Sequence, residues 1–315
     1  MDALLLAVTG IDPQPWQQRF RTLAPRRDLR VWPEAIGNPA EVGYACVWQT
    51  PRGLLGRFAR LKAIFSLGAG VDHILADPTL PDVPIVRIVD PELTMRMSEY
   101  VALHVLMHHR RQRLYDAQQR ERVWREHEQA AASEIGVGVM GLGVLGRDAA
   151  LVLRRLGFVV VGWSRSPKNL PDIAVFHGED QLETFLSRSE ILICLLPLTR
   201  TTQGILRLEL LRKLKRDGAA GSAYLINVGR GALQVETDIL AALAEGTLAG
   251  VTLDVFAEEP LPLESPLWTH PRVTITPHNA AMSDPRALVA NVLRQIERFE
   301  AGLPPENVVD RGQGY

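Results

Sequence analysis

The chain has 315 residues, of which 46% are hydrophobic and 23% are charged, and its formal net charge is −1. This composition is typical of a globular protein with a full core, and the length favours two domains over one. A net charge near zero gives no reason to expect nucleic acid or an anionic membrane as a partner, and no apolar run approaches the ~20 residues of a membrane-spanning helix.

The N-terminus, Met1-Asp-Ala-Leu-Leu-Leu, lacks the basic stretch that opens a signal peptide, and we interpret it as the beginning of a first strand. The two cysteines, Cys46 and Cys194, both lie in apolar runs that resemble strands. We therefore expect two reduced core thiols rather than a disulfide, which fits a cytoplasmic protein.

The first part of the chain alternates short apolar runs with helical patterns. Strands are expected at residues 3–8, 29–32, 44–48, 63–67 and 83–89, and a helix at residues 16–23. Such alternation predicts a parallel sheet with helices on its faces, so this part of the chain should form an α/β unit of its own.

A long helix is expected next, from Ser98 through a charged stretch that ends at Glu128. One face of its first part would carry Tyr100, Leu103, Leu106 and Met107. The charged part is interrupted by Leu114, Tyr115, Val123 and Trp124. A helix of this kind can connect two domains, and its apolar interruptions can dock a second subunit. The alternative is a solvated helix that packs on its own chain alone.

Three glycines, Gly141, Gly143 and Gly146, have the spacing G-x-G-x-x-G. They follow an apolar, strand-like run at 137–140 and precede an apolar helical pattern at 149–156. In a dinucleotide site the first glycine permits the tight turn, the second lets a pyrophosphate approach the backbone, and the third lets helix and strand pack closely. The helix N-terminus offers N–H groups to the phosphates. The pattern predicts a dinucleotide site, against the alternative of a glycine-rich turn that binds nothing.

The choice of dinucleotide depends on the residues after the strand expected at 158–163. In an NAD site an Asp or Glu about 20 residues beyond the glycines holds the ribose 2′-OH. Here the sequence is Ser164-Arg-Ser-Pro-Lys168, with no acid. Arg165 and Lys168 could bind a 2′-phosphate through charge-assisted hydrogen bonds. We therefore predict NADP(H) as the preferred cofactor, with NAD(H) possible, and an ordinary basic loop as the alternative.

The remaining chain continues the alternation of strands and helices. Strands are expected at 191–196, 223–228, 251–255 and 273–276, and helices at 181–186, 208–214, 236–244 and 286–300. Ligands of open parallel sheets bind beyond the carboxyl ends of the strands, and Arg230, Asp254 and His278 lie at or just past such ends. The last helix is long enough to return to the first domain.

Arg230, Glu259 and His278 have the side chains that ketone reduction requires. A guanidinium can bind a carboxylate through two hydrogen bonds and polarise a carbonyl group. A histidine can donate a proton to the developing alkoxide, and a carboxylate beside it would favour the imidazolium and orient the ring. Taken singly, each residue could equally be a turn arginine, a solvated acid or a satisfied loop histidine.

Several motifs together resemble those of the D-isomer-specific 2-hydroxyacid dehydrogenases, and within that family the glyoxylate/hydroxypyruvate reductase A branch. The resemblance covers nearly the whole chain. Its motifs are Gly68-Ala-Gly-Val-Asp72, Gly141-Leu-Gly-Val-Leu-Gly146, Trp163-Ser-Arg165, Leu195-Leu-Pro197, Asn227-Val-Gly-Arg-Gly231, Asp254-Val-Phe-Ala-Glu-Glu-Pro260, Ser265-Pro-Leu-Trp268 and Thr276-Pro-His278.

The resemblance implies a role for each catalytic candidate. Arg230 would bind the substrate, His278 would donate the proton, and Glu259, directly before the Pro of its motif, would be the partner of His278. Asp254 would hold the nicotinamide carboxamide. The candidate cofactor contacts are Gly141, Leu142, Gly143, Val144, Leu145, Gly146, Trp163, Ser164, Arg165, Ser166, Lys168, Leu196, Pro197, Thr202, Asn227, Val228, Gly229 and Asp254.

The substrate site is implied to lie partly in the first domain. The backbone at Ala69, Gly70 and Val71 would receive the substrate carboxylate, together with Arg230 and His278. Trp48 would form an aromatic wall. One departure is Asn279, which follows His278 where this branch usually has a smaller or apolar residue, so substrate preference is left open.

The implied fold is α/β with two lobes: a flavodoxin-like substrate domain, residues 1–97 plus 284–315, and a Rossmann doubly wound coenzyme domain, residues 98–283. The implied activity is NAD(P)H-dependent reduction of small 2-keto acids, glyoxylate to glycolate and hydroxypyruvate to D-glycerate. A homodimer through the coenzyme domain is implied, and no metal site is expected. The alternatives are a dehydrogenase of the same family with another 2-keto acid and a nucleotide-sensing corepressor with little turnover.

Overall fold

The computed structural model describes residues 2–315. Its internal contacts divide the chain into a first unit, Met1–Leu93 with Ser283–Tyr315, and a second unit, Thr94–Met282. The domain boundaries expected from the sequence, at 97/98 and 283/284, lie close to these divisions. Over the described residues, none of the helices combines the length and the apolar character needed to cross a membrane.

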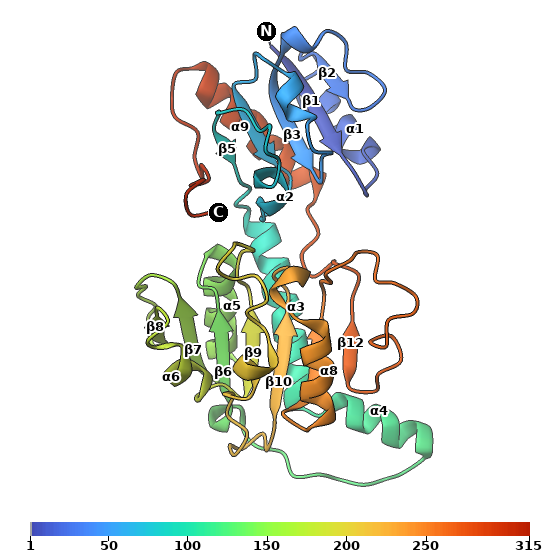
Figure 1. Ribbon diagram of the computed structural model, residues 1–315, viewed down its shortest axis with the longest axis vertical. Coiled ribbons are helices and arrows are strands. Elements are labelled where there is room, and N and C mark those ends of the chain that lie inside the picture. The colour runs from blue at the N-terminus through green and yellow to red at the C-terminus, as the bar shows by residue number, and fades with distance from the viewer. Residues whose placement is uncertain (1) are drawn as a thin grey trace. The chain divides into compact units, whose positions relative to one another are not determined.

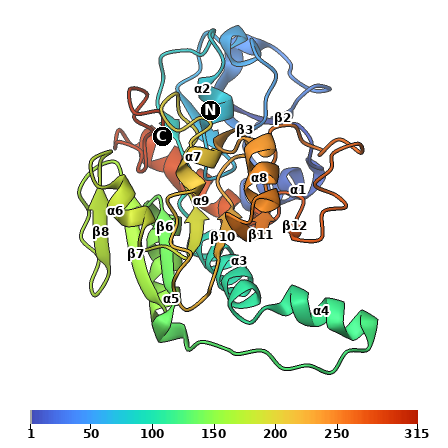
Figure 2. The same ribbon diagram turned by 60° about the horizontal axis from the view of Figure 1, so that its bottom comes forward.

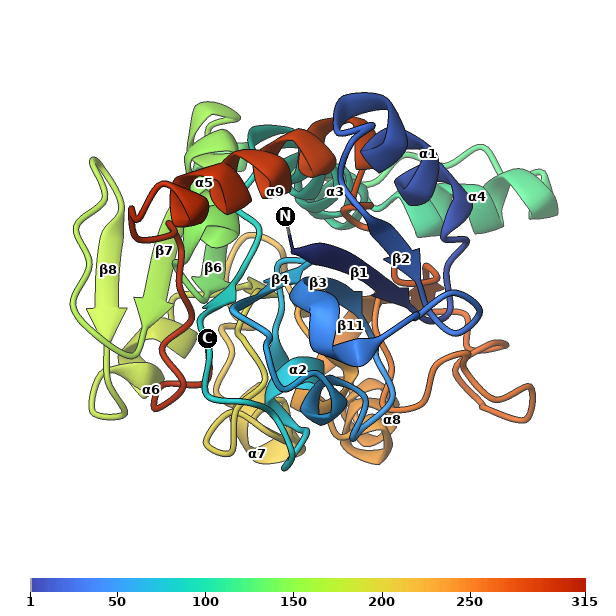
Figure 3. The same ribbon diagram turned by 90° about the horizontal axis from the view of Figure 1, so that it is seen from above.

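The first unit is built around a parallel five-stranded sheet of order β2-β1-β3-β4-β5, the order of the flavodoxin-like doubly wound fold. Helices α1 and α9 cover one face, and α2 lies on the other (Figure 3). Its elements are β1 (Ala3–Val8), α1 (Gln14–Leu23), β2 (Leu29–Val31), η1 (Pro39–Glu41), β3 (Val42–Trp48), η2 (Leu55–Arg57), β4 (Ala63–Ser66), α2 (Asp72–Leu75), β5 (Ile85–Val86) and α9 (Pro285–Glu300).

Helix α9 returns the end of the chain to the first unit, as its length suggested. Its start is well defined because the Asp284 side chain accepts a hydrogen bond from the N–H of Arg286 at 2.8 Å and Pro285 occupies the first turn. The apolar face of α9 is buried with Trp16 and Phe20 of α1 and with the strands. Residues from both ends of the sequence therefore complete one core.

The second unit has a parallel seven-stranded sheet of order β12-β11-β10-β9-β6-β7-β8, most of which can be followed in Figure 1. From β6 the chain adds β7 and β8 on one side and then β9 to β12 on the other side, so the strand order reverses between β6 and β9, as in a Rossmann fold. Helices α3 and α5 pack on one face, and α6, α7 and α8 on the other. The elements are α3 (Pro91–His109), which begins in the first unit, α4 (Gln112–Glu121), η3 (Ala132–Glu134), β6 (Gly136–Met140), α5 (Val144–Arg155), β7 (Val159–Ser164), β8 (Ala174–His177), α6 (Leu182–Leu186), β9 (Ile191–Cys194), α7 (Leu208–Leu211), β10 (Ala223–Asn227), η4 (Gly231–Leu233), α8 (Glu236–Ala244), β11 (Leu248–Leu253) and β12 (Val273–Ile275).

The single long helix expected up to residue 128 is wrong. Helix α3 ends at His109 because Arg111 has a left-handed backbone with φ +53°, which a right-handed helix cannot continue. Helix α4 ends in the same way before Arg122, at φ +57°. The following extended segment is held by Gln118, whose amide donates to the carbonyl of Arg125 at 3.0 Å. Figure 2 shows α4 and this segment projecting beyond the sheet of their unit.

The buried face of α3 also differs from the expected one. Met97, Val101 and Val105 lie in the core, whereas Leu103 and Leu106 are 54% and 37% exposed. Apolar side chains occur on more than one side of this helix, so periodicity alone does not select the face that packs on the sheet.

Two strands depart from the sequence prediction. The strand expected at 83–89 is reduced to β5, Ile85–Val86. Strand β8 was not predicted, although residues 173–176 form a short apolar run, and it lies partly exposed at the edge of the sheet. The strand expected at 3–8 and the helix expected at 236–244 occur with the same ends, and the other expected elements occur with ends shifted by a few residues.

Candidate active site

The three catalytic candidates follow neighbouring strands of the second unit. Strands β10, β11 and β12 lie side by side and run parallel, so their carboxyl ends meet at one edge of the sheet. Arg230 follows β10, Glu259 follows β11 and His278 follows β12. The topology therefore brings together loops that are far apart in the sequence.

Glu259 and His278 are joined by a short hydrogen bond. Glu259 Oε2 lies 2.8 Å from His278 Nδ1, and 30% of each side chain is exposed. Glu259 Oε1 accepts from the backbone N–H of Phe256 at 2.9 Å, which fixes the carboxylate plane. This geometry orients the imidazole.

Burial by itself would raise the pKa of the Glu259 carboxyl group. The hydrogen bonds from His278 and Phe256 and the positive charge of Arg230 outweigh it, so the pKa of Glu259 lies below its ordinary value. Glu259 is therefore the negative member of the pair at neutral pH.

Two buried amide side chains hold the loop that carries Arg230 through hydrogen bonds. Asn227 is fully buried, and its amide donates to the carbonyl oxygen of Arg230 at 3.1 Å and to Gln234 Oε1 at 2.8 Å. Gln234 in turn donates to the carbonyl of Val255 at 3.0 Å. The candidate cofactor contact Asn227 thus has its side chain engaged within the protein, where it positions the arginine loop.

Asp254, only 1% exposed, organises the loop that carries His278. Its carboxylate accepts hydrogen bonds from the backbone N–H groups of Asn279 at 2.9 Å and Ala280 at 3.1 Å. Its carbonyl oxygen accepts from the N–H of His278 at 2.8 Å. His278 itself has φ +52°, a left-handed conformation that a histidine keeps only where surrounding contacts impose it. The side chain of Asn279 is not needed for this arrangement, which uses its backbone.

The glycine-rich turn has the geometry of a phosphate cradle. Gly141 has φ +104°, and a Cβ atom on Gly146 would lie 1.8 Å from the carbonyl oxygen of Gly141, so strand β6 and helix α5 can pack this closely only through glycine. A Cβ on Gly143 would meet no atom within 4 Å. The first turn of α5 has no side-chain cap, since Gly143 precedes it. Open space and N–H donors therefore coincide where a pyrophosphate would lie.

The residues beside this turn divide into buried and exposed ones. Leu142 and Trp163 are buried, and Trp163 Nε1 donates to the carbonyl of Gly178 at 2.9 Å, so neither side chain is available to a ligand. Val144 is 40% exposed and Leu145 is half-buried. The helix surface at the turn is therefore apolar.

The loop after β7 keeps both predicted cations at the surface. Arg165, Ser166 and Lys168 are exposed. Ser164 is buried, and its hydroxyl donates to the carbonyl oxygen of Ser166 at 2.7 Å, which closes the turn. Ser164 thus shapes the loop, while the side chains of Arg165 and Lys168 lie at the surface.

The other cofactor candidates line the ends of β9 and β10. Leu196 and Val228 are buried, and a Cβ on Gly229 would lie 2.9 Å from the carbonyl oxygen of Leu196, so these two loops touch. The Thr202 hydroxyl donates to the carbonyl of Pro197 at 2.7 Å and rigidifies the loop after β9.

The substrate candidates of the first unit form a tight turn after β4. Ser66 is fully buried, and its hydroxyl lies 2.9 Å from the carbonyl oxygen of Gly68 and 3.2 Å from that of Gly70. A Cβ on Gly68 would lie 2.2 Å from the ring of Trp48, so the turn and Trp48 pack directly on each other. Beyond them, Ala69 and Gly70 are half-buried and Val71 is a core residue.

The sequence did not indicate that Ser66, Gln234 and Thr276 shape these loops, and it placed Tyr100 only as a member of one face of a helix. The available signal for the first three was a polar residue at or beside a strand end or motif. For Tyr100 there was none, because its hydroxyl is paired with Thr276, 176 positions away.

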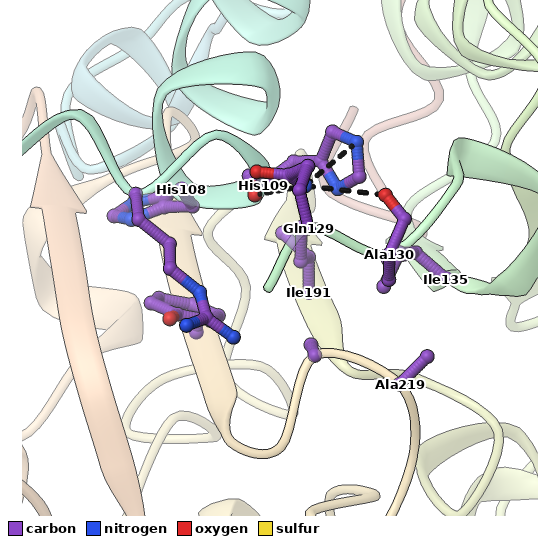
Figure 4. A pocket seen from close by; sticks show the side chains of 10 residues that line it. His108, His109, Gln129, Ala130, Ile135, Ile191 and Ala219 are labelled. Carbon is purple, nitrogen blue, oxygen red and sulfur yellow. Dashed lines mark hydrogen bonds between the residues drawn. The ribbon is translucent and has the colours of Figure 1, made fainter. Parts of the chain in front are cut away.

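A small pocket lies at the opposite edge of the same sheet, at the amino ends of β9 and β10 (Figure 4). Gln129 donates there to the carbonyl oxygens of His109 at 3.0 Å and Ala130 at 3.2 Å. Ile191, Ala219 and other side chains complete its lining. Ligands of open parallel sheets bind at the carboxyl ends of the strands, so this pocket is separate from the candidate active site.

The comparisons agree with this architecture. A family model described as D-isomer specific 2-hydroxyacid dehydrogenase, NAD binding domain, matches residues 102–280. The glyoxylate/hydroxypyruvate reductase A of Yersinia enterocolitica is 41% identical over 310 residues, which are 96% of this chain and 97% of that protein. The chain belongs to the D-isomer-specific 2-hydroxyacid dehydrogenase family.

Two solved members of the 2-hydroxyacid dehydrogenase family superpose on the whole chain. An NADPH-dependent glyoxylate/hydroxypyruvate reductase from Sinorhizobium meliloti, in complex with NADP and sulfate, is 44% identical with a TM-score of 0.95 over 100% of both chains. A D-isomer specific 2-hydroxyacid dehydrogenase from Xanthobacter autotrophicus, in complex with NADPH and MES, is 42% identical with a TM-score of 0.94, again over 100% of both chains. The predicted family, its reductase A branch, the oxidoreductase class and the two-sheet α/β fold are confirmed.

Proposed function

We propose that this 2-hydroxyacid dehydrogenase reduces small 2-keto acids with NADPH, glyoxylate to glycolate and hydroxypyruvate to D-glycerate. The observation that carries the proposal is the Glu259–His278 pair at 2.8 Å, on the same sheet edge as Arg230 and in the same unit as the glycine turn. The relatives named glyoxylate/hydroxypyruvate reductase, one of them NADPH-dependent, support the substrate class and the cofactor.

The residues of the second unit divide the chemistry among them. The cofactor, when bound, supplies a hydride to the carbonyl carbon of the keto acid. His278 donates a proton to the carbonyl oxygen, and Glu259 stabilises the imidazolium before the transfer. Arg230 binds the substrate carboxylate and polarises the carbonyl group. The product is the 2-hydroxy acid, and His278 regains its proton from solvent.

The cofactor fits the glycine turn. Gly143 leaves room for the pyrophosphate, the uncapped start of α5 supplies N–H donors, and Asp254 holds the nicotinamide carboxamide. Arg165 and Lys168, both exposed, bind the 2′-phosphate, and this selects NADPH over NADH. The buried side chains of Leu142, Trp163 and Asn227 act by shaping the site.

The proposal gives the turn after β4 in the first unit a role in binding substrate. The turn at Ala69, Gly70 and Val71 offers backbone N–H groups to the substrate carboxylate, and Trp48, which packs on this turn, offers an aromatic wall beside it. The first unit is accordingly the substrate domain and the second unit the coenzyme domain.

We also propose a cytoplasmic homodimer through the coenzyme domain. Its support is a set of exposed apolar side chains on α3, α4 and the segment after α4. They are Leu103, Leu106, Leu114, Val123 and Trp124, the last of which is 100% exposed. Sedimentation velocity would test the assembly, and a Trp124→Glu, Leu114→Glu variant should sediment as a monomer.

The test of the activity is direct. The purified protein is mixed with NADPH or NADH and a panel of 2-keto acids, and the loss of nicotinamide absorbance is followed. Turnover of glyoxylate or hydroxypyruvate with NADPH supports the proposal. A clear preference for a different 2-keto acid would replace the substrate, and cofactor binding without turnover of any keto acid would favour a nucleotide-sensing protein.

A further inference from the structure

Helix α3 is joined to the catalytic loop by a chain of two short hydrogen bonds. The Tyr100 hydroxyl lies 2.6 Å from Thr276 Oγ1, and Thr276 Oγ1 lies 2.6 Å from Asp254 Oδ1. Thr276 comes directly after strand β12 and two residues before His278. Tyr100 is therefore the far end of a relay that reaches the Asp254 carboxylate from the helix.

The direction of donation in this relay follows from the chemistry of its members. Both oxygens of Asp254 accept backbone N–H groups, and an ionised carboxylate can only accept. The single proton of the Thr276 hydroxyl is directed to Asp254, so Thr276 Oγ1 must accept the proton of Tyr100. Each hydroxyl has one proton, and removing either hydroxyl leaves a half-buried polar group on its neighbour without that partner.

The relay opposes the effect of burial on Asp254. Burial raises the pKa of the Asp254 carboxyl group, and hydrogen bonds from Thr276, Ala280 and Asn279 act in the opposite direction. An ionised carboxylate offers about four acceptor positions, and three donors within residues 2–315 occupy it. Oδ2 accepts one of them and has one acceptor position left.

We propose that Tyr100 and Thr276 are positioning residues that hold the Asp254 carboxylate ready to accept the N–H of the nicotinamide carboxamide. This inference rests on the proposed binding of a nicotinamide cofactor by Asp254. The same carboxylate holds the N–H groups of Asn279 and Ala280, so the relay also fixes the loop on which His278 stands in its left-handed conformation.

The probe is a pair of cofactors that differ at the carboxamide. NADP⁺ has the amide, and 3-acetylpyridine adenine dinucleotide phosphate has a methyl ketone with no N–H donor. Binding of each is measured by quenching of protein fluorescence, which needs no turnover. In the wild type, a hydrogen bond to a charged acceptor should favour NADP⁺ by about tenfold or more.

Three variants test the relay. Thr276→Val keeps the side-chain shape and removes the hydroxyl, and Tyr100→Phe keeps the ring that packs on His104 at 4.2 Å. Both should reduce the NADP⁺ preference by about threefold to tenfold. Thr276→Ser keeps a hydroxyl and should stay within about twofold of the wild type. In the Thr276→Val background, Tyr100→Phe should add no further change, because its effect passes through Thr276.

Tyr224→Phe is the matched control, since it removes a phenol from the same unit at the other end of the sheet, where the ring packs on His108 at 4.8 Å. Its preference ratio should equal that of the wild type. The proposal is overturned if the wild type binds both cofactors equally, if folded Tyr100→Phe keeps the full preference, or if Tyr224→Phe loses it too. If Thr276→Val does not fold, Tyr100→Phe and Thr276→Ser still decide.

Activity separates this inference from the proposed function. With a 2-keto acid, Tyr100→Phe should lower kcat by about threefold to tenfold and leave the KM of the keto acid within about twofold. A wild type that shows the predicted cofactor ratios but reduces no keto acid would overturn the proposed reaction and keep the relay. If the wild type reduces glyoxylate and all variants keep the wild-type ratio of cofactor affinities, the proposed reaction is kept and the relay is overturned.

Discussion

Replacing Glu259 with Gln should lower kcat/KM for keto-acid reduction by about tenfold to thirtyfold at neutral pH. The pKa of Glu259 lies below its ordinary value, so its negative charge is present throughout the neutral range. In the proposed reaction His278 transfers a proton to the carbonyl oxygen, and the charge of Glu259 attracts the imidazolium that donates it. A glutamine side chain keeps the shape of the glutamate but not its charge, so Glu259→Gln loses this attraction.

The size of this loss follows from the geometry of the pair. Two unit charges about 4 Å apart attract by about 4 kcal/mol at an effective dielectric constant of about 20. Since Nδ1 and Oε2 are in contact at 2.8 Å but 30% of each side chain is exposed, screening should leave less than half of that. About 1.5–2 kcal/mol corresponds to a rate factor of about ten to thirty.

The assay is kcat/KM for glyoxylate with saturating NADPH at neutral pH. Glu258→Gln is the matched control, because it makes the same chemical change at the neighbouring, exposed position and should keep the wild-type value. Equal kcat/KM values for wild type and Glu259→Gln would show that the carboxylate charge does not assist proton donation, and would refute the assigned role of Glu259.

Three further predictions concern the proposed roles. His278→Ala should lower kcat by about 10²–10⁴ in the same assay while NADPH binding persists, and wild-type turnover would remove His278 from the mechanism. Arg230→Ala should raise the KM of the keto acid by about tenfold or more, because it deletes the carboxylate anchor, so an unchanged KM would contradict that role. The double variant Arg165→Ala, Lys168→Ala should weaken NADPH binding by roughly tenfold to several hundredfold in low salt and leave NADH binding nearly unchanged. Arg155→Ala, at another exposed arginine, is the control. Equal affinities of the wild type for both cofactors would show that this loop is an ordinary basic surface and does not select NADPH.

The sequence predicted the parts of this protein that depend on local patterns. Buried parallel strands are apolar runs, so most strands could be located, and with them the loops that carry Arg230 and His278. Gly141 and Gly146 could be interpreted from spacing because their roles are set by backbone geometry.

The features that escaped prediction depend on contacts between distant residues or on a single backbone angle. No residue near Tyr100 in the sequence indicates that its hydroxyl is hydrogen-bonded to Thr276. The break between α3 and α4 depends on the left-handed conformation of Arg111, and the surrounding sequence has no Gly, Asn or Pro to indicate it. Asn227 was expected to contact the cofactor, and only the fold shows that its amide is engaged by Gln234.

Two glycines of the same turn, Gly143 and Gly146, should respond differently to substitution: one affects cofactor binding and the other affects folding. Alanine at Gly146 would place a methyl group on the carbonyl oxygen of Gly141 and should disturb the fold itself. Gly143 has φ −71° and open space around it, so alanine there meets no obstacle within the chain. Such a variant should express and resist heat like the wild type while lacking room for the pyrophosphate. A screen for stability alone would therefore not detect its loss of cofactor binding.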